Sequence, residues 1–236
     1  MFKTSTEKVK AAARPAGERT RELIFERALE LFRRSGFDET TMRDIARAAK
    51  VATGAAYYYF PSKEAIVSAY YDRVQSLHAV RVREELAGKE GLRARLGMVT
   101  HSKLEILQND RMFLGALFRY TGEPGHPLSV FGKGTAAQRK QSMELFRQAL
   151  EGSEVSEELK QFLPWVLWLV HLGMILFFIH DESERQAKTH KLVDGVLDSL
   201  ATLLEFTNSA LVRPFVKPLE AKLLGILREA GWAGEI

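Results

Sequence analysis

The chain of 236 residues contains no cysteine. This absence excludes a disulfide scaffold, a zinc site built on thiolates and a thiol nucleophile. It also fits a reducing cytoplasm, where we expect the protein to work. A sustained alternation of apolar and polar residues, which marks a half-buried strand, is missing as well, so we expect an all-α protein.

Motifs for catalysis or metal binding are equally scarce. His171 and His180 lie nine positions apart, which is not the spacing of a zinc-binding helix. Gly132-Lys133 lacks the first glycine and the final Ser or Thr of a phosphate-binding loop, and no nucleophile elbow is present. We therefore expect no catalytic residue, no metal and no cofactor. An enzyme with its active site in a helical bundle stays a less favoured alternative.

The chain has one long apolar run, over residues 162–179. Its 18 residues reach the short end of the range that spans a membrane, so a membrane-associated helical protein is one alternative. The run carries His171 near its centre, and no cluster of basic residues flanks it. A helix that is apolar all round can equally lie buried between protein surfaces. We favour this second interpretation and expect no membrane contact.

Charge of one sign is in excess only at the beginning of the chain. Residues 1–60 hold 12 Lys or Arg against 8 Asp or Glu, whereas residues 61–236 hold 22 of each. Such asymmetry indicates contact with a polyanion, or a solvated basic arm. We expect a flexible basic arm over 1–17, because no apolar run of signal-peptide length follows Met1.

Three helices are expected before residue 60. Apolar residues recur with helical spacing over 18–35, and Gly36 follows as a natural stop. Thr41 and Asp44 form a capping box before a short helix that ends near Ala49. Another short helix covers about 52–59, and Ser62 caps a long helix to about residue 86. Two short helices in close succession after a longer one are typical of a helix-turn-helix.

The second short helix contains three consecutive tyrosines, Tyr57, Tyr58 and Tyr59. Successive side chains on a helix point about 100° apart. The three rings cannot all lie in the core, so at least one hydroxyl must face water or a partner. Tyrosine hydroxyls can bond DNA phosphates, but an aromatic helix with its hydroxyls at the rim of a core is the simpler alternative.

The run from about Arg21 to Lys63 resembles the DNA-binding domain of the TetR family of bacterial transcriptional regulators. The resemblance is carried by Ala28-Leu29-Glu30-Leu31-Phe32, Gly36-Phe37, Thr40-Thr41-Met42-Arg43-Asp44-Ile45-Ala46 and the segment 51–64, VATGAAYYYFPSKE. It implies a ligand-responsive regulator, most plainly a repressor released from a palindromic operator by a small effector. It also implies an N-terminal three-helix DNA-binding domain followed by a C-terminal helical bundle for ligand binding and dimerisation.

The resemblance also implies which residues meet double-stranded DNA. Base contacts are expected of Arg43, Thr53, Gly54 and Tyr57. Arg43 suits guanine, because its guanidinium matches the two guanine acceptors. Phosphate contacts are expected of Thr41, Tyr58, Tyr59 and Lys63.

Two positions depart from the family pattern. Lys50 stands where the family often has glycine, and a left-handed conformation at a lysine costs about 1 kcal/mol. We therefore expect the turn between the two short helices to be shaped differently. Ala55, also within the DNA-binding surface, replaces a frequent threonine and so offers no hydroxyl to a phosphate.

The remaining chain also has helical periodicity. We expect a DNA-binding domain over 18–63 and an effector-binding and dimerisation domain over 64–236, with helices at 91–109, 111–121, 133–151, 156–180, 185–207 and 218–230. Residues 121–127 are expected to form a loop. The resemblance implies a homodimer through the helices near 156–180 and 185–207, which would cover their excess of apolar surface. The role of the last helix, 218–230, is open.

An effector cavity inside the C-terminal bundle is implied by the family. Its candidate lining residues are aromatic, apolar or histidine side chains from three expected helices: Met98, His101, Leu104, Phe113, Leu117, Tyr120, Trp165, Trp168, His171, Met174 and Phe178. Each of these would pack in a core equally well. Few charges interrupt these helices, so we expect a mostly apolar effector. The effector, the operator sequence and the regulated genes are not readable from the residues.

Overall fold

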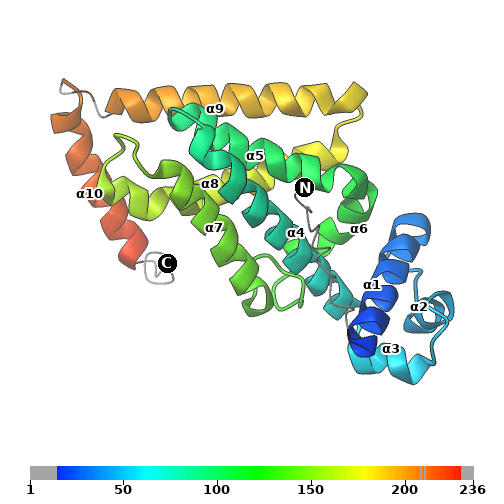
Figure 1. Cartoon of the computed structure of the whole chain (residues 1–236). Helices are drawn as coiled ribbons and strands as arrows, with labels where there is room; N and C mark the ends of the chain where they lie inside the picture. Colours follow the sequence, from blue (N-terminus) through cyan, green and yellow to red (C-terminus); the bar gives the residue numbers. More distant parts are fainter. Residues whose placement is uncertain (1–14, 208, 210, 230–236) are drawn as a thin grey trace, which may run out of the picture. The chain divides into compact units, whose positions relative to one another are not determined.

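A computed structural model describes residues 15–207, 209 and 211–229 of the chain (Figure 1). It divides into two compact units, Met1–Ile66 and Val67–Ile236. The described residues form helices and no strands, which confirms the all-α prediction. Residues 1–14 of the expected basic arm lie outside the described residues. The first helix begins at Ala16, two residues before its expected start.

The described part of the first unit, from residue 15 on, contains three helices and the beginning of a fourth. They are α1 (Ala16–Ser35), α2 (Met42–Ala48), α3 (Thr53–Tyr59) and the first residues of α4 (Lys63–Glu85). Helix α1 packs against both α2 and α3, and α2 packs against α3. The core between them is apolar, and small side chains at Ala46, Ala49 and Ala56 let the short helices approach closely.

Local signals place the ends of these helices as predicted. Gly36 follows α1 with φ 89°, a conformation that glycine adopts without strain. Thr41 and Asp44 form the capping box of α2, and the Oγ of Ser62 accepts a hydrogen bond from the backbone N–H of Ala65 in α4. These bonds satisfy amide groups that the first turn of a helix leaves without partners.

The expectation of a different turn at Lys50 is wrong. Lys50 takes φ 54°, the left-handed conformation that glycine would have taken. The backbone N–H of the next residue, Val51, donates to the carbonyl of Ala46 across 3.0 Å. This bond closes the end of α2 and offsets the strain at the lysine.

The second unit contains the rest of α4 and six further helices in the described part of the chain: α5 (Leu92–Leu107), α6 (Arg111–Thr121), α7 (Ala136–Leu150), α8 (Glu157–His180), α9 (Ala187–Thr207) and α10 (Arg213–Glu229). Single 3₁₀ turns at Lys133–Thr135 and Glu184–Gln186 open the helices expected at 133–151 and 185–207. The loop between α6 and α7 includes the expected residues 121–127, except that Thr121 ends α6.

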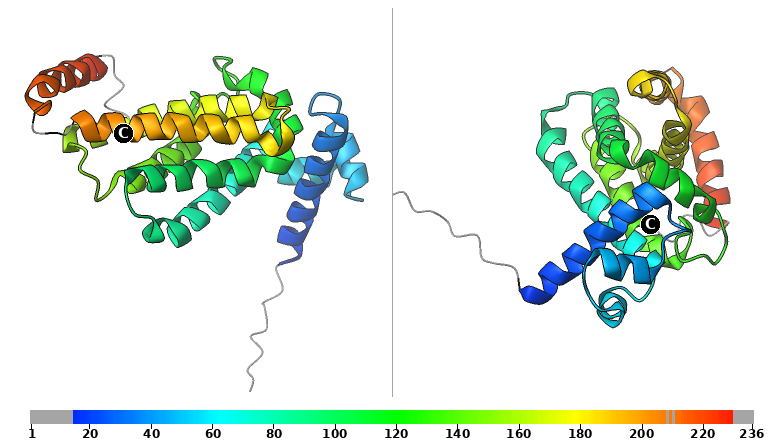
Figure 2. Two further views of the ribbon diagram at one scale, coloured as in Figure 1. Left: turned by 90° about the horizontal axis from the view of Figure 1, so that it is seen from above. Right: turned by 90° about the vertical axis from the view of Figure 1, so that its right-hand side faces the viewer.

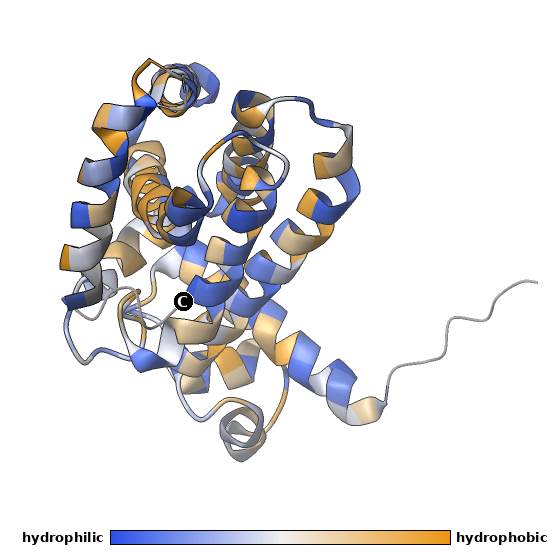
Figure 3. Ribbon diagram, turned by 90° about the vertical axis from the view of Figure 1, so that its left-hand side faces the viewer, coloured by the Kyte–Doolittle hydropathy of each residue, from blue (hydrophilic) through white to orange (hydrophobic). Residues whose placement is uncertain are grey.

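Helix α8 explains the long apolar run. It packs against α5, α6, α7, α9 and α10 within the unit, and the views from two sides show α8 and α9 side by side (Figures 1 and 2). Figure 3 shows hydrophobic and hydrophilic residues interspersed along the other helices. Helix α8 is long and apolar enough to cross a membrane, and 44% of its apolar stretch is buried among these five helices.

The last helix begins earlier than expected. Helix α10 starts at Arg213, five residues before the expected start at Pro218, which lies inside the helix. Pro214 is in the first turn, where a missing N–H removes no hydrogen bond, and Pro218 removes only one. The backbone N–H groups of Arg213 and Val216 donate to Ser209 and Val212, so the helix is established before Pro218.

Candidate nucleic-acid interface and effector cavity

Helix α2 presents one free arginine. The side chain of Arg43 is exposed and has no hydrogen bond or ion pair within residues 15–207, 209 and 211–229. Arg47, one turn later, is instead held by the carboxylate of Asp44 across 3.1 Å. Arg43 can therefore reach a base edge without first breaking an ion pair, whereas Arg47 cannot.

Thr41 is exposed at the N-terminus of α2, but its hydroxyl is already engaged. The Oγ1 donates to the Asp44 carboxylate across 2.5 Å and accepts from the Asp44 backbone N–H across 3.2 Å. The bond from the Thr41 side chain is the main cause of a lowered pKa at Asp44. The predicted phosphate contact of Thr41 would share the hydroxyl with the capping box.

Helix α3 presents its first turn to solvent. Thr53 and Gly54 are exposed, and a Cβ added at Gly54 would meet no atom within 4 Å. The next two residues turn inward, since Ala55 is half-buried and Ala56 is fully buried. The small residues therefore divide into two groups, one open to a partner and one that lets α3 pack on its neighbours.

The three tyrosines take the three different environments that their spacing predicts. Tyr58 is 82% exposed and Tyr57 49% exposed, whereas Tyr59 is half-buried. The rings of Tyr58 and Tyr59 meet edge to face with centroids 5.1 Å apart. The prediction that at least one hydroxyl faces water or a partner is confirmed.

The side chain of Lys63 is hydrogen-bonded to the backbone of the first unit. Its Nζ donates to the carbonyl of Phe37 across 2.7 Å and to the carbonyl of Asp38 across 3.2 Å, and it lies 4.5 Å from the centroid of the Phe37 ring. Partial burial lowers the pKa of the ammonium group. An ammonium has three N–H donors, so one is left for the predicted phosphate contact.

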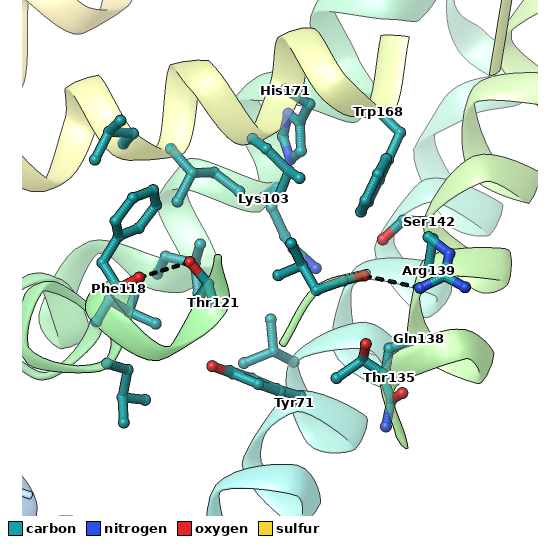
Figure 4. A pocket seen from close by; sticks show the side chains of 18 of the residues that line it. Tyr71, Lys103, Phe118, Thr121, Thr135, Gln138, Arg139, Ser142, Trp168 and His171 are labelled. Atoms are coloured by element: carbon teal, nitrogen blue, oxygen red, sulfur yellow. Dashed lines mark hydrogen bonds between the residues drawn. The ribbon is translucent and has the colours of Figure 1, made fainter. Parts of the chain in front are cut away.

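The second unit contains a cavity of about 630 Å³, within the usual range of small-molecule sites. Helices α4 to α8 and the loop before α7 supply its walls (Figure 4). Aliphatic residues of α6 and α8 and several aromatic rings supply a large part of the apolar lining: Tyr71, Leu114, Leu117, Phe118, Phe131, Trp168, Leu169, Leu172, Ile175, Leu176 and Ile179.

Three of the eleven candidate residues line this cavity, namely Leu117, Trp168 and His171. The other eight are not among the described residues of its lining, so their predicted role there is not supported: Met98, His101, Leu104, Phe113, Tyr120, Trp165, Met174 and Phe178. Most of them are buried between helices, because the same composition suits packing as well as a ligand. His101 is bonded to His190 across 3.2 Å and to Asp194 across 3.0 Å.

Polar groups of the cavity come mainly from positions that the sequence reasoning missed. The Nζ of Lys103 donates to the Oε1 of Gln75, whose Nε2 donates to the carbonyl of Gln138 and to the Oγ of Ser142. The Oε1 of Gln138 is buried without a hydrogen bond in the described chain. Lys103 lies among other polar residues of α5, beside Ser102 and two positions before Glu105, so no sequence pattern sets this cluster apart.

His171 is the other polar group of the apolar wall. Its side chain is 4% exposed, and neither ring nitrogen has a hydrogen-bond partner among the described residues. Its ring meets Phe146 edge to face. Burial, reinforced by the positive charge of Lys103, holds the pKa of His171 well below its usual value, so the ring is neutral.

Comparison with known families matches the segments that contain both sites. Residues 24–70 match the family model described as bacterial regulatory proteins, tetR family. Residues 95–219, more than half of the chain, match the model described as Tetracyclin repressor-like, C-terminal domain. The first match contains α2, α3 and Lys63, and the second contains most of the cavity.

Individual relatives are similar over different lengths. YuxN of Bacillus subtilis, an uncharacterized HTH-type transcriptional regulator, is 46% identical over 55 residues, which are 22% of this chain and only 19% of that protein. The HTH-type transcriptional regulator LuxR of Vibrio harveyi is 26% identical over 182 residues, 75% of this chain and 86% of LuxR. A TetR transcriptional regulator from Nitrosomonas europaea has the same fold, with a TM-score of 0.63, 19% identity and coverage of 78% of this chain and 98% of that one. The chain thus belongs to the TetR family of bacterial helix-turn-helix transcriptional regulators.

Proposed function

We propose that this regulator is a homodimeric repressor that binds a palindromic operator and leaves it when a small, mostly apolar effector occupies the cavity. The observation that supports this proposal most directly is which residues of α2 and α3 are exposed and which are buried. Arg43, Thr53, Gly54 and Tyr57, which the family resemblance assigns to bases, are all exposed, whereas Ala56 between them is buried. The first turn of α3 and the free guanidinium of α2 therefore form one open surface for a major groove.

Helix α9 carries a second apolar stripe in addition to its buried one. Leu192, Leu203 and Phe206 are exposed, with Gly195 and Ser199 between them at helical spacing. A Cβ added at Gly195 would meet no atom within 4 Å. Small residues in the middle of an exposed apolar stripe let another helix approach closely, which suits packing against a symmetry mate.

Helix α8 offers a matching stripe of Val166, Val170, Gly173 and Phe177, of which Gly173 also lines the cavity. The two valines are half-buried, and Gly173 and Phe177 are exposed. Two adjacent helices with such stripes would form a four-helix interface in a two-fold dimer. Dimerisation would also give two reading helices for the two halves of a palindrome, since one short helix contacts few base pairs.

Helix α4 connects the cavity with the DNA-binding unit through the chain itself. It begins at Lys63, and farther along it supplies Tyr71, Val74 and Gln75 to the cavity lining. An effector that binds one arrangement of α4 more tightly than another would shift the population between DNA-binding and free dimers. The effector needs this differential affinity, because equal affinity for both arrangements would shift nothing.

The remaining alternatives gain no support. The packing of α8 inside the bundle offers an explanation of its apolar sequence without lipid. The relatives are transcriptional regulators, so we propose a regulatory and not an enzymatic role, in the cytoplasm where bacterial DNA lies.

A charged substitution in the proposed interface tests the proposal. Leu203→Glu should convert the dimer into monomers in sedimentation and should greatly weaken binding to an operator obtained by selection from random DNA. Glu205→Gln, at an exposed polar position of the same helix, is the matched control and should change neither. A wild-type protein that sediments as a monomer and binds the operator as tightly as Leu203→Glu would overturn the proposal.

A further inference from the structure

The charged residues of the cavity are all cationic. Lys103, Arg119 and Arg139 line it, and no Asp or Glu is among the described lining residues. Arg139 is held at one side by the carbonyls of Val130 and Gly132, at 2.8 and 3.3 Å. The cavity of this otherwise balanced unit therefore has a positive potential, which attracts an anion.

Lys103 is the most buried of these cations, with 6% of its surface exposed. The side-chain amide of Gln75 holds Lys103 in position. Its two N–H groups donate to Gln138 and Ser142, so the Oε1 of Gln75 is left to accept from Lys103. One carbonyl-type oxygen satisfies one of three ammonium donors. A buried ammonium with no carboxylate beside it is costly, and an anion that entered the cavity would remove that cost.

His171 supplies a second unsatisfied donor on the facing wall. Its neutral ring must carry one N–H, and neither nitrogen has a partner in the described chain. Figure 4 shows the ring of His171 and the chain of Lys103 projecting into the same part of the cavity. Buried donors without partners cost free energy that a ligand acceptor would recover.

Another part of the lining, on α8, suits an apolar body. Leu169, Leu172, Ile175, Leu176 and Ile179 of α8 form a continuous aliphatic wall, and aromatic rings face it from α4 and α6. The aliphatic side chains have no hydrogen bonds to offer. A ligand that fits both regions has one anionic end and a long or broad apolar remainder.

We propose, building on the effector role proposed above, that the cavity takes an amphipathic monocarboxylate with its carboxylate between Lys103 and His171 and its apolar body along α8. A single carboxylate matches one ammonium and one imidazole N–H. The mostly apolar effector expected from composition is thereby narrowed to an organic acid.

The affinity for such an acid should depend on pH through Lys103. Burial lowers the pKa of Lys103 to about 7, and a bound carboxylate would raise it. Above pH 7, binding must then take up a proton, so affinity falls as pH rises. Among the groups around Lys103, burial lowers the pKa of His78 and His171 and raises that of Tyr71, which moves all three away from the range in which Lys103 titrates. Arg119 and Arg139 also line the cavity. On another face of α5, His190 and Asp194 bond to His101 instead.

Calorimetry with the full-length protein tests the proposal, using dodecanoate and dodecan-1-ol as probes below their aggregation limits. Wild type should bind dodecanoate about 10- to 100-fold more tightly than the alcohol, the range of one charge-assisted hydrogen bond. Lys103→Met should remove this preference, and Lys140→Met, an exposed lysine of α7 outside the cavity, should keep it. From pH 7.5 to 9 the wild-type dissociation constant for dodecanoate should rise by roughly tenfold per unit, while Lys103→Met stays flat.

Each other outcome contradicts the inference. Equal affinity of wild type for acid and alcohol, tighter binding of dodecyl phosphate than of dodecanoate, or binding of neither probe would overturn the carboxylate assignment. The comparison of probes on wild type holds even if Lys103→Met fails to fold. The dimeric, operator-binding role would stand through all of these results, because Leu203→Glu and the selection of DNA test it separately.

Discussion

The Nε2 of Gln75 donates a hydrogen bond to the Oγ of Ser142 across 2.6 Å, and this bond joins α4 to α7 at the wall of the cavity. The same amide nitrogen donates to the backbone carbonyl of Gln138. Gln75 is buried, so its polar atoms depend on these partners. A ligand beside Lys103 would meet the residue that holds α4 in place.

Ser142→Ala should therefore destabilise the protein by about 1 kcal/mol, because one bond to a buried amide is lost while the bond to Gln138 remains. Urea unfolding followed by circular dichroism measures the change. Ser76→Ala is the control, since this exposed serine of α4 donates only to its own helix, at the carbonyl of Asp72. Equal stability of wild type and Ser142→Ala would show that the bond does not hold α4 against α7.

Arg43→Ala should relax base preference at one position of each half-site. The free energy of binding to the preferred sequence should become less favourable by about 1–3 kcal/mol. Binding to unrelated DNA should weaken less. Arg47→Ala removes the same charge from the same helix, but its guanidinium is paired with Asp44, so it should leave base preference unchanged. Fluorescence anisotropy with the selected operator and its single-base variants gives both comparisons. Loss of preference in Arg47→Ala, with preference kept in Arg43→Ala, would show that the two roles are reversed.

Much of the DNA-binding unit could be predicted from the sequence because its signals are local. Gly36, the capping box of Thr41 and the cap at Ser62 lie within a few residues of the helix ends that they determine. The shape of the turn at Lys50 could not be predicted in this way. The hydrogen bond that stabilises it, from Val51 to Ala46, joins two backbone groups, and the side chains in the sequence do not indicate it.

The cavity was predictable in existence but not in composition. Apolar spacing identifies α5, α6 and α8, yet it does not tell which of their faces meets a helix and which meets a space. Phe113 and Phe178 accordingly fill the core, and Trp168 and His171 line the cavity. Such patterns do not predict the role of Lys103, because its hydrogen-bond partner Gln75 lies 28 positions earlier in the chain.

The free energy of unfolding should depend on pH through the carboxylate of Asp181. Its buried carboxylate accepts four hydrogen bonds, from the backbone and hydroxyl groups of Ser183 and Thr189, at 2.6–2.9 Å. Burial alone would raise the pKa of Asp181, but these bonds outweigh it, the Ser183 side chain first, and hold the pKa far below its usual range. The stabilisation is thus complete above pH 4 and is lost as pH falls toward the lowered pKa.

Asp181→Asn should lower the melting temperature at pH 7, because an amide cannot accept all of these bonds. The difference from wild type should narrow below pH 4, where the wild-type carboxylate also loses its contribution. Thermal melts from pH 2.5 to 7 measure it, with the exposed neighbour in Glu182→Gln as the control. A difference that widens as pH falls would contradict the assigned sign.

Selection of bound duplexes from random DNA by the full-length protein tests the central claim most directly. A two-fold dimer that reads with the exposed ends of α2 and α3 should enrich a palindrome whose half-sites lie about one helical turn apart, roughly 10 base pairs, or a multiple of it. Mass measurement of the complex should give an even number of protein chains per duplex. Enrichment of no sequence, or of a single unpaired half-site bound by one chain, would contradict the account.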